Sequence, residues 1–343
     1  MMKKWLLLLA VVSSSSEVVA QSRDQQMRER VDSVLTERYY RSPYDTNYVV
    51  RPEGRLTLKL RLNQSGNDFH ARGTVNDIYS KADLKTSHKT TFAVVGIYRG
   101  IGVGVAINPY KWNGVYKDYE FNFNYYSSRL SLDASYQRST TLAGDIERGD
   151  DDSRLESGDV TLKVLNVAGY YVFNHRRFSY SAAFTQSYIQ RRSAGSWLAG
   201  ISYQGGSIET TDALKERLRV GEQSSGMRNP NAPDTRIYIG HFGIGGGYGY
   251  NWVLGKKWLL HFSMLPTFVI YNRNNLTVNG ERRKAQRTRF NMIFNERAAI
   301  VHNFSARYFA GITLAMNNSV FDDDVVVVNQ NKWRVRASFG LRL

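Results

Sequence analysis

Six histidines are the residues of this sequence best suited to catalysis or metal binding: His70, His88, His175, His241, His261 and His302. None of them has the H-x-x-x-H spacing of a helical metal site. Ser263 follows His261 by two residues, and residues two apart on a β-strand point to the same side, so His261 could serve as the base for a Ser263 nucleophile. No acidic partner is evident. The favoured reading is that His241 and His261 line a polar interior, and a lipid-modifying hydrolase is the alternative.

Carboxylates and cysteines offer little further chemistry. The chain contains no cysteine, which excludes disulfides, thiolate nucleophiles and thiolate metal sites. The run 150–152 and the run 322–324 each contain three consecutive aspartates, but neither has the spaced ligand pattern of a calcium loop. We expect both to be solvated acidic loops. No metal and no cofactor is expected, and an enzymatic role is left open.

The positive charges are more informative. The net charge is +16, and because no nucleic-acid-binding motif is present, anionic lipid headgroups, lipopolysaccharide, anionic solutes or an acidic partner are the expected partners. At the C-terminus, "KWRVRASFGLRL" alternates apolar residues with Arg334, Arg336 and Arg342, and near residue 56 "RLTLKLRLN" does the same with Lys59 and Arg61. Each of these segments therefore predicts a strand with one apolar and one cationic face.

The same alternation recurs along the chain and predicts a fold. Strands are expected at about 56–62, 88–98, 100–107, 120–126, 129–136, 159–173, 178–189, 197–208, 235–252, 257–271, 287–301, 306–317 and 333–343. Short turns and long polar loops separate them, which is typical of a transmembrane antiparallel up-and-down β-barrel, here of about 12–14 strands. A soluble two-domain β-protein is the second interpretation.

A barrel closes by pairing its first and last strands, so the five cations should share one wall of the lumen. Like charges on adjacent strands repel unless they are paired or hydrated. The expected partners are Glu120, Asp133, Glu296 or the segment 182–196. Two readings stay open: a cationic pore wall that favours anions, or a salt-bridged plug.

The number of short turns conflicts with the position of the longest loop. If residues 99–100, 127–128 and 174–177 turn on one side, the loop 209–234 falls on that same side. Either 182–196 is an irregular segment in the lumen, or a further strand lies within 209–234.

Glycines mark one face of a strand near residue 245. Gly243, Gly245, Gly247 and Gly249 alternate with larger residues in "FGIGGGYGYNW". Glycine is unfavourable in a strand unless close packing requires it. We therefore expect these four residues to face the lumen, opposite something bulky: His261, the arginine cluster or the segment 182–196.

The N-terminus predicts export. Residues 1–20 have the basic start, short apolar stretch and small-residue ending of a cleavable signal peptide. Residues 21–50 should form a periplasmic helix, at about 24–40, and a lead-in, with the barrel over 51–343. The expected location is the outer membrane.

Several segments together resemble a known family. "NHRRFSYSAAFTQSYIQRRSAGSWL", "YDTNYV", "YKDYEFNFNYY" and "GIGGGYGYN" are similar to domain-of-unknown-function family 4421 of Bacteroidetes-type Gram-negative bacteria, whose members look like outer-membrane β-barrels. The resemblance implies a location and a fold but no activity. The function that we expect is a binding or passage scaffold for small polar or anionic solutes. A lipid-modifying enzyme and a structural or surface-interaction barrel are the alternatives.

Overall fold

Antiparallel β-strands make up most of the molecule. The computed structural model describes residues 25–27, 29–30, 33, 44–52, 54, 56–75, 78–98, 101–107, 118–217, 235–278, 281–284, 290–322 and 326–343. The expected signal peptide lies outside the described residues, as does most of the expected helix at 24–40. The residues of that helix that are described are helical.

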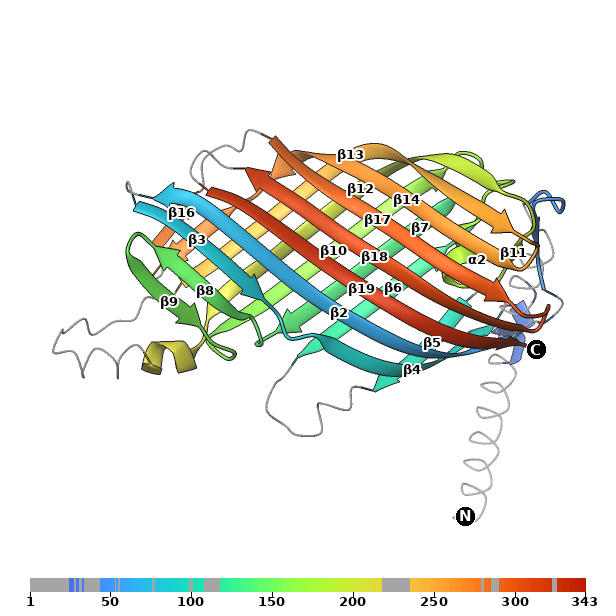
Figure 1. The fold of residues 1–343 in the computed structure, drawn as a ribbon, viewed down its shortest axis with the longest axis horizontal. Helices are drawn as coiled ribbons and strands as arrows, with labels where there is room; N and C mark the ends of the chain where they lie inside the picture. The colour runs from blue at the N-terminus through green and yellow to red at the C-terminus, as the bar shows by residue number, and fades with distance from the viewer. Residues whose placement is uncertain are drawn as a thin grey trace, which may run out of the picture.

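Twelve long strands form the wall within the described part of the chain. They are β2 (Leu56–Val75), β4 (Lys89–Tyr98), β5 (Ile101–Ile107), β6 (Tyr119–Tyr126), β7 (Leu130–Ser139), β10 (Val160–Val172), β12 (Ala194–Thr210), β13 (Thr235–Leu254), β14 (Trp258–Asn272), β17 (Phe290–Asn303), β18 (Tyr308–Asp322) and β19 (Val326–Arg342). β2, β4 and β5 pair antiparallel in this order, and so do the strands from β6 to β19, in which β10 follows β7 and β17 follows β14. The expected all-β, up-and-down architecture of 12–14 strands is confirmed (Figure 1).

The first and last long strands pair, as a barrel requires. β19 runs antiparallel to β2, from Arg342 opposite Thr57 to Val326 opposite Gly73. Side chains from opposite sides of the curled sheet also meet across its concave side, for example Gln204 of β12 and Gln330 of β19. The concave side is therefore a filled interior.

Short strands lengthen the wall at the end away from the C-terminus (Figure 1). They are β3 (Ile78–Lys85), β8 (Ala143–Arg148), β9 (Asp151–Leu155), β15 (Asn275–Val278) and β16 (Glu281–Lys284). We call this the long-loop end. The opposite end carries the turns β6–β7, β13–β14 and β17–β18, and we call it the short-turn end.

The connection between β10 and β12 also lies at the short-turn end, and it resolves the conflict over sidedness. Its residues 173–193 form a turn, the helix α2 (Tyr180–Phe184) and the two-residue strand β11 (Ile189–Gln190). The strand expected over 178–189 is therefore wrong. Ser179 caps a helix by accepting a hydrogen bond from the backbone of Ala182, and capping of this kind favours helix over strand.

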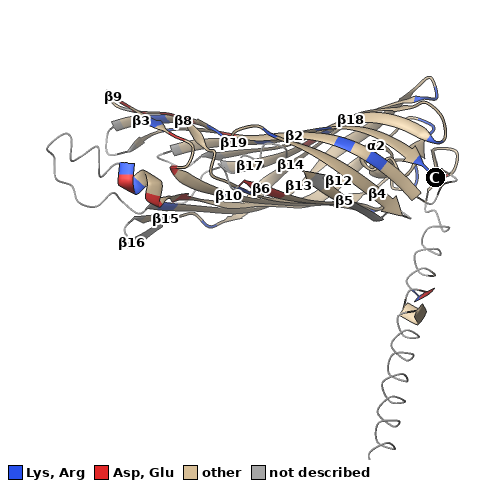
Figure 2. Ribbon diagram, turned by 90° about the horizontal axis from the view of Figure 1, so that it is seen from below, with Lys and Arg blue, Asp and Glu red and all other residues tan. Residues whose placement is uncertain are grey.

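This connection folds into the interior, and we call residues 173–193 the plug. Phe178, Ala183 and Gln186 are almost completely buried, and α2 lies within the outline of the strands near the C-terminus (Figure 2). The first of the two explanations, an irregular lumen segment, is thus the one observed, although Ala194–Ser196 belong to β12. Residues 212–217 are helical, and residues 218–234 lie outside the described part.

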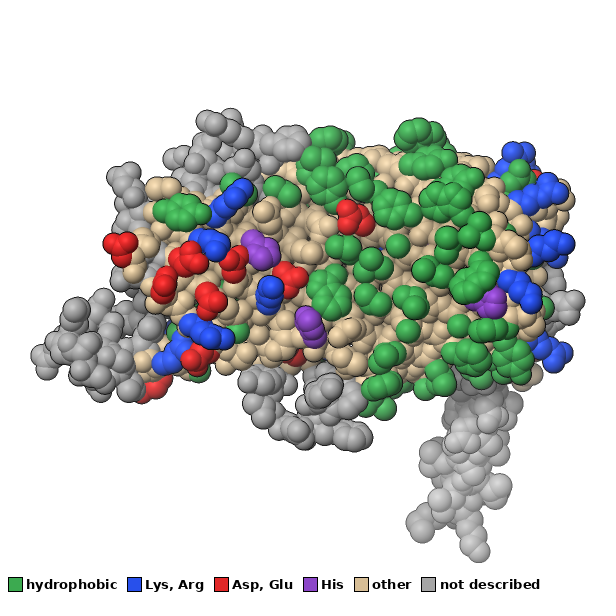
Figure 3. Space-filling view, in the orientation of Figure 1, with side chains coloured by type: hydrophobic (Ala, Val, Ile, Leu, Met, Phe, Trp, Pro, Cys, Tyr) green, Lys and Arg blue, Asp and Glu red, His purple; other side chains and the backbone are tan. Residues whose placement is uncertain are grey.

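The outer surface near the short-turn end is apolar (Figure 3). Large exposed side chains come from many strands: Leu60, Phe92, Val94, Phe121, Trp197, Ile244, Phe262, Ile300, Ile312 and Phe339. An apolar surface spread over so many strands far exceeds the scattered exposed leucines of a soluble monomer. No helix among the described residues is long and apolar enough to cross a membrane.

Candidate functional site

A buried ion pair stands at the centre of the interior. Asp133 of β7 lies 3.3 Å from the Nη2 atom of Arg297, which reaches it from β17 on the other side of the sheet. Tyr126 donates to Asp133 at 2.5 Å, and Tyr170 and Asn124 donate to it as well. A buried carboxylate with this many donors is well satisfied. The pair therefore fixes two opposite walls of the barrel.

Arg297 was not among the residues that the sequence pointed to. Asp133 was expected to neutralise the cationic wall, but its ionic partner is Arg297. The available signal was the position of Arg297 in "FNERAAIV", two residues before Ala299 on the face that turns inward. Glu296 is one residue out of phase, on the opposite face of β17, where it accepts a hydrogen bond from Asn318. The expectation that Glu296 neutralises the cationic wall is therefore wrong.

Two cations of the wall contact the plug. Lys59 donates to the carbonyl oxygen of Thr185 at 3.0 Å and to the side-chain oxygen of Gln186 at 2.9 Å. Arg342 donates to the backbone oxygen of Gln186 at 3.2 Å and to Asn303. The first and last strands thus hold the end of α2 through charge-assisted hydrogen bonds, which are stronger than neutral ones.

The other three cations meet few opposite charges. Arg334 lies 3.4 Å from Glu120, and Arg336 donates to the amide oxygen of Asn124 at 3.0 Å. Arg61 has a buried Nε atom with no hydrogen-bond partner among the described residues. Glu120 and Asp133 are the carboxylates near this group, and Asp133 pairs with Arg297, so the inner wall carries an excess of positive charge.

A small cavity of about 30 Å³ lies beside these cations, between the wall and Phe184 of the plug. Arg297, Arg334 and Arg336 line it together with Asn166. Both polar atoms of the Asn166 side chain, and the Nε atom of Arg336, are buried without a hydrogen-bond partner in the described part of the chain. Unsatisfied buried polar groups are costly, and a cavity of this size holds a few waters or a small ion.

His261 forms a relay with two neighbours. Its Nδ1 atom lies 2.7 Å from Oδ1 of Asn251, and its Nε2 atom lies 2.9 Å from Oγ of Ser263. An amide oxygen only accepts, so Nδ1 carries the proton and Nε2 accepts from the serine hydroxyl. This is the arrangement of a nucleophile, a base and an orienting group. Asn251 is the orienting residue that the sequence did not reveal, because it lies on the neighbouring strand.

The relay is closed off from solvent. Ser263 and His261 are 2% and 3% exposed, and the rings of Phe178, Tyr180 and Phe184 pack against the imidazole. Asn251 also donates to the Ser179 carbonyl and to Gln190 of the plug. The hydrogen bonds of Asn251 and the ring contacts of His261 therefore hold the plug against β13 and β14.

His241 is also fully buried, but it stands apart from His261. It pairs with Asn272 in the ladder, whereas His261 pairs with Asn251 ten residues further along β13. The structure therefore does not bring the two histidines together. Within the residues described, no group of His, Asp and Glu side chains is placed to hold a metal ion.

The four glycines lie on the concave side of β13, in phase with His241 and Asn251. At Gly249 an added Cβ atom would lie 3.1 Å from the Phe178 ring of the plug. At Gly245 and Gly247 it would lie about 2.0 Å from the carbonyl oxygens of Pro266 and Met264. At those two positions the close neighbour is the backbone of β14, and not a side chain filling the lumen as expected. Pro266 has no amide hydrogen to donate to the ladder. Gly247 and Pro266 are not among the paired residues of β13 and β14.

The N-terminal lead-in is bound to the plug. β1 (Val49–Val50) pairs with β11, and the backbone of Asp45 donates to the carbonyl of Arg176. Ser179 donates to the hydroxyl of Tyr44, and burial raises the pKa of Tyr44 above its ordinary value. The lead-in and the plug therefore form one packed unit at the short-turn end.

Comparisons with solved structures return outer-membrane proteins of low similarity. The outer-membrane protease OmpT from Escherichia coli matches with 8% identity and a TM-score of 0.37, over 85% of this chain and 97% of that chain. The outer-membrane protein OprG from Pseudomonas aeruginosa matches with 9% identity and a TM-score of 0.27, over 85% and 97%. The toluene transporter TodX from P. putida matches with 7% identity and a TM-score of 0.28, over 85% and 91%. No curated protein matches.

A sequence family also matches most of the chain. The model of the family described as "Domain of unknown function (DUF4421)" aligns with residues 43–342. This range runs from the lead-in through the plug to the last strand, and it includes the cationic wall and the glycine face. The chain belongs to this family.

Proposed function

We propose that this protein is an integral outer-membrane β-barrel whose interior binds small anionic solutes. One observation carries the proposal: the cavity beside Arg297, Arg334 and Arg336 has more positive charge than the carboxylates facing it can balance. Guanidinium groups donate in a planar fork that suits carboxylates and other oxyanions. The cavity volume of about 30 Å³ limits the solute to a small ion.

The outer surface supports the membrane location. Apolar side chains cover the convex side while charged and amide side chains are buried within. A soluble protein has the reverse distribution, and a membrane barrel has this one. The plug occupies one end of the interior, so the proposal is for binding, and passage would require the plug to move.

Thermal unfolding of the detergent-refolded chain tests the binding. A ligand that binds only the folded state raises its stability by mass action. At constant ionic strength, chloride, nitrate and formate should raise the Tm more than citrate, which is too large for the cavity. Arg336→Gln should reduce this difference, whereas Arg154→Gln, at an exposed position in β9, should retain it. An equal response of all anions, or an unchanged response in Arg336→Gln, would contradict the proposal.

The Ser263–His261–Asn251 relay favours a second candidate function, a hydrolase acting on lipid. Its two hydrogen bonds place a base on a serine hydroxyl, but a substrate would first have to displace the aromatic residues of the plug. A fluorophosphonate probe offered to the protein in lipid vesicles separates the candidates. Labelling that disappears in Ser263→Ala, together with lipid turnover, would support the hydrolase. Absence of labelling in the presence of an anion-dependent Tm would leave the solute-binding role.

A further inference from the structure

Positive charge is concentrated at the short-turn end of the barrel (Figure 3). The exposed cations of its turns and of the plug are Arg129, Arg176, Arg177, Arg191, Arg192, Lys256, Lys257 and Arg307. Opposing them among the described residues of this end are Asp45, whose carboxylate lies 3.9 Å from Arg177, and the carboxylate of the C-terminal Leu343. This end therefore has a strong excess of positive charge.

The long-loop end is different, because many of its cations have carboxylate partners. Lys81 lies between Asp83 and Glu147, and Lys163 contacts Glu209. Arg217 contacts both Glu156 and Asp159. The excess is thus local to one end of the molecule, and is not simply the net charge of the chain spread over its surface.

Aromatic side chains lie immediately beside these cations. Trp258 follows Lys257 and Tyr308 follows Arg307, and both rings are nearly half exposed. The ring centroid of Trp258 lies 4.3 Å from that of His302, which in turn contacts Phe304. Aromatic rings next to cations are typical of the zone between lipid tails and headgroups.

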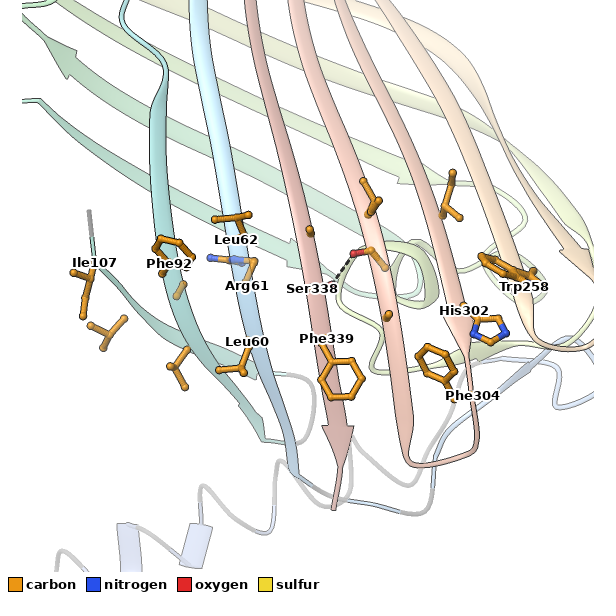
Figure 4. Close-up of a pocket in the computed structure, with 18 residues that line it drawn as sticks. Leu60, Arg61, Leu62, Phe92, Ile107, Trp258, His302, Phe304, Ser338 and Phe339 are labelled. Carbon is orange, nitrogen blue, oxygen red and sulfur yellow. Dashed lines mark hydrogen bonds between the residues drawn. The ribbon is translucent and has the colours of Figure 1, made fainter. Parts of the chain in front are cut away.

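An apolar hollow of about 830 Å³ continues from this aromatic group along the convex surface. Figure 4 shows Trp258, His302 and Phe304 on one side of it and Leu60, Phe92 and Ile107 on the other. Its remaining lining residues are mainly aliphatic. An apolar hollow beside exposed cations matches the two parts of an amphiphile, an apolar chain and a charged headgroup.

We propose that the short-turn end binds an anionic diacyl phospholipid, with its phosphate at Lys257 and Arg307 and an acyl chain in the hollow. The inference rests on the proposed membrane location, and it is independent of the solute that the interior binds. An acidic protein would satisfy the cations but would leave the hollow and the exposed rings in contact with water. A lipid satisfies both at once.

The association of spin-labelled lipids tests this site. The full mature chain is inserted into phosphatidylcholine vesicles that carry a trace of labelled phosphatidylglycerol or labelled phosphatidylcholine. The wild type should prefer phosphatidylglycerol, and added salt should weaken the preference. Removal of one cation near a membrane surface should lower the preference by at most about fivefold, so Lys257→Gln with Arg307→Gln should nearly abolish it.

Arg72→Gln with Arg154→Gln is the matched control, because both arginines are exposed at the long-loop end. It should keep the preference of the wild type. Equal association of both lipids with the wild type, or an equal loss in the control, would overturn the inference while leaving the membrane location standing. A preference confined to labelled lipopolysaccharide would also overturn it. Failure to enter any bilayer would overturn the membrane location and this inference with it.

Discussion

At the scale of single residues, a network of buried polar groups connects the walls of the interior. Asp133 of β7 accepts hydrogen bonds from two phenols, an amide and a guanidinium, and these groups come from β6, β10 and β17. A buried charge is tolerated only when it is paired and hydrogen-bonded. Removal of either Asp133 or its partners should therefore reduce the free energy of unfolding.

Removal of one member of the Asp133–Arg297 pair should be strongly destabilising. Asp133→Asn leaves Arg297 buried without its counter-ion, and Arg297→Met leaves Asp133 in the same condition. Breaking a buried pair in this way costs about 3–5 kcal/mol, to be measured as the free energy of unfolding by urea in lipid vesicles. The double variant should cost clearly less than the sum of the single variants, since it leaves no isolated charge. Additive costs would show that the two residues do not interact.

At the scale of elements, two close contacts determine how the strands and the plug fit together. β13 approaches β14 so closely at Gly245 and Gly247 that a methyl group would overlap a carbonyl oxygen. The lead-in and the plug pack as a unit through β1 and β11.

Gly247→Ala should prevent close pairing of β13 with β14. Its Cβ atom would lie 1.9 Å from the oxygen of Met264, whereas the nearest atom at Gly246, on the opposite face, is 3.2 Å away. Overpacking of this kind costs about 1–3 kcal/mol or more. We expect Gly247→Ala to lower the yield of heat-resistant folded barrel in gel electrophoresis much more than Gly246→Ala. Equal yields would contradict the close approach.

Alkaline pH should release the lead-in from the plug. Burial raises the pKa of Tyr44 above its ordinary value of 10.0, so the folded state disfavours the tyrosinate. The stability of the docked lead-in is complete below that ordinary value, and it is lost as the pH rises from about 10 towards the raised pKa. Limited proteolysis of residues 44–52 should therefore increase in this range.

Tyr44→Phe is the control for this effect. It keeps the ring and removes the ionisable hydroxyl, so protection of the lead-in should extend to higher pH than in the wild type. Identical pH profiles for the two proteins would assign the release to other groups.

At the scale of the whole molecule, side chains are distributed inside out. Arg334 and Lys332 of β19 are buried, whereas Phe339 of the same strand is 50% exposed. This distribution fits the proposed membrane location, because in water most of the apolar surface would contact solvent. The basic short-turn end and the mixed charges of the long-loop end give the barrel a polarity along its axis.

Phe339→Arg should destabilise the barrel in lipid. A cation on the lipid-facing side costs about 2–4 kcal/mol at the membrane midplane and less near an interface. Ser338→Gln, on the concave face, should cost less; arginine at that position would meet Arg61 across the strand pair and is a poorer control. Unfolding by urea in phospholipid vesicles measures both. Equal losses would contradict the assignment of the two faces.

Local sequence predicted the strands and their faces, because the period-two alternation depends only on neighbouring residues. It predicted that Lys59 and Arg342 belong to paired strands, because an up-and-down barrel must join its ends. It also reduced the conflict over sidedness to two alternatives. The family relationship likewise followed from segments of the chain itself.

Only the tertiary structure decided which residues meet. The pairing of Asp133 with Arg297, 164 positions away, depends on the curvature and register of the whole sheet. The relay of Asn251, His261 and Ser263 needs β13 beside β14, and the helix within 178–189 needs the interior that buries it. Such contacts arise because a curled sheet brings distant strands face to face, and no local pattern records which side chains then lie opposite each other.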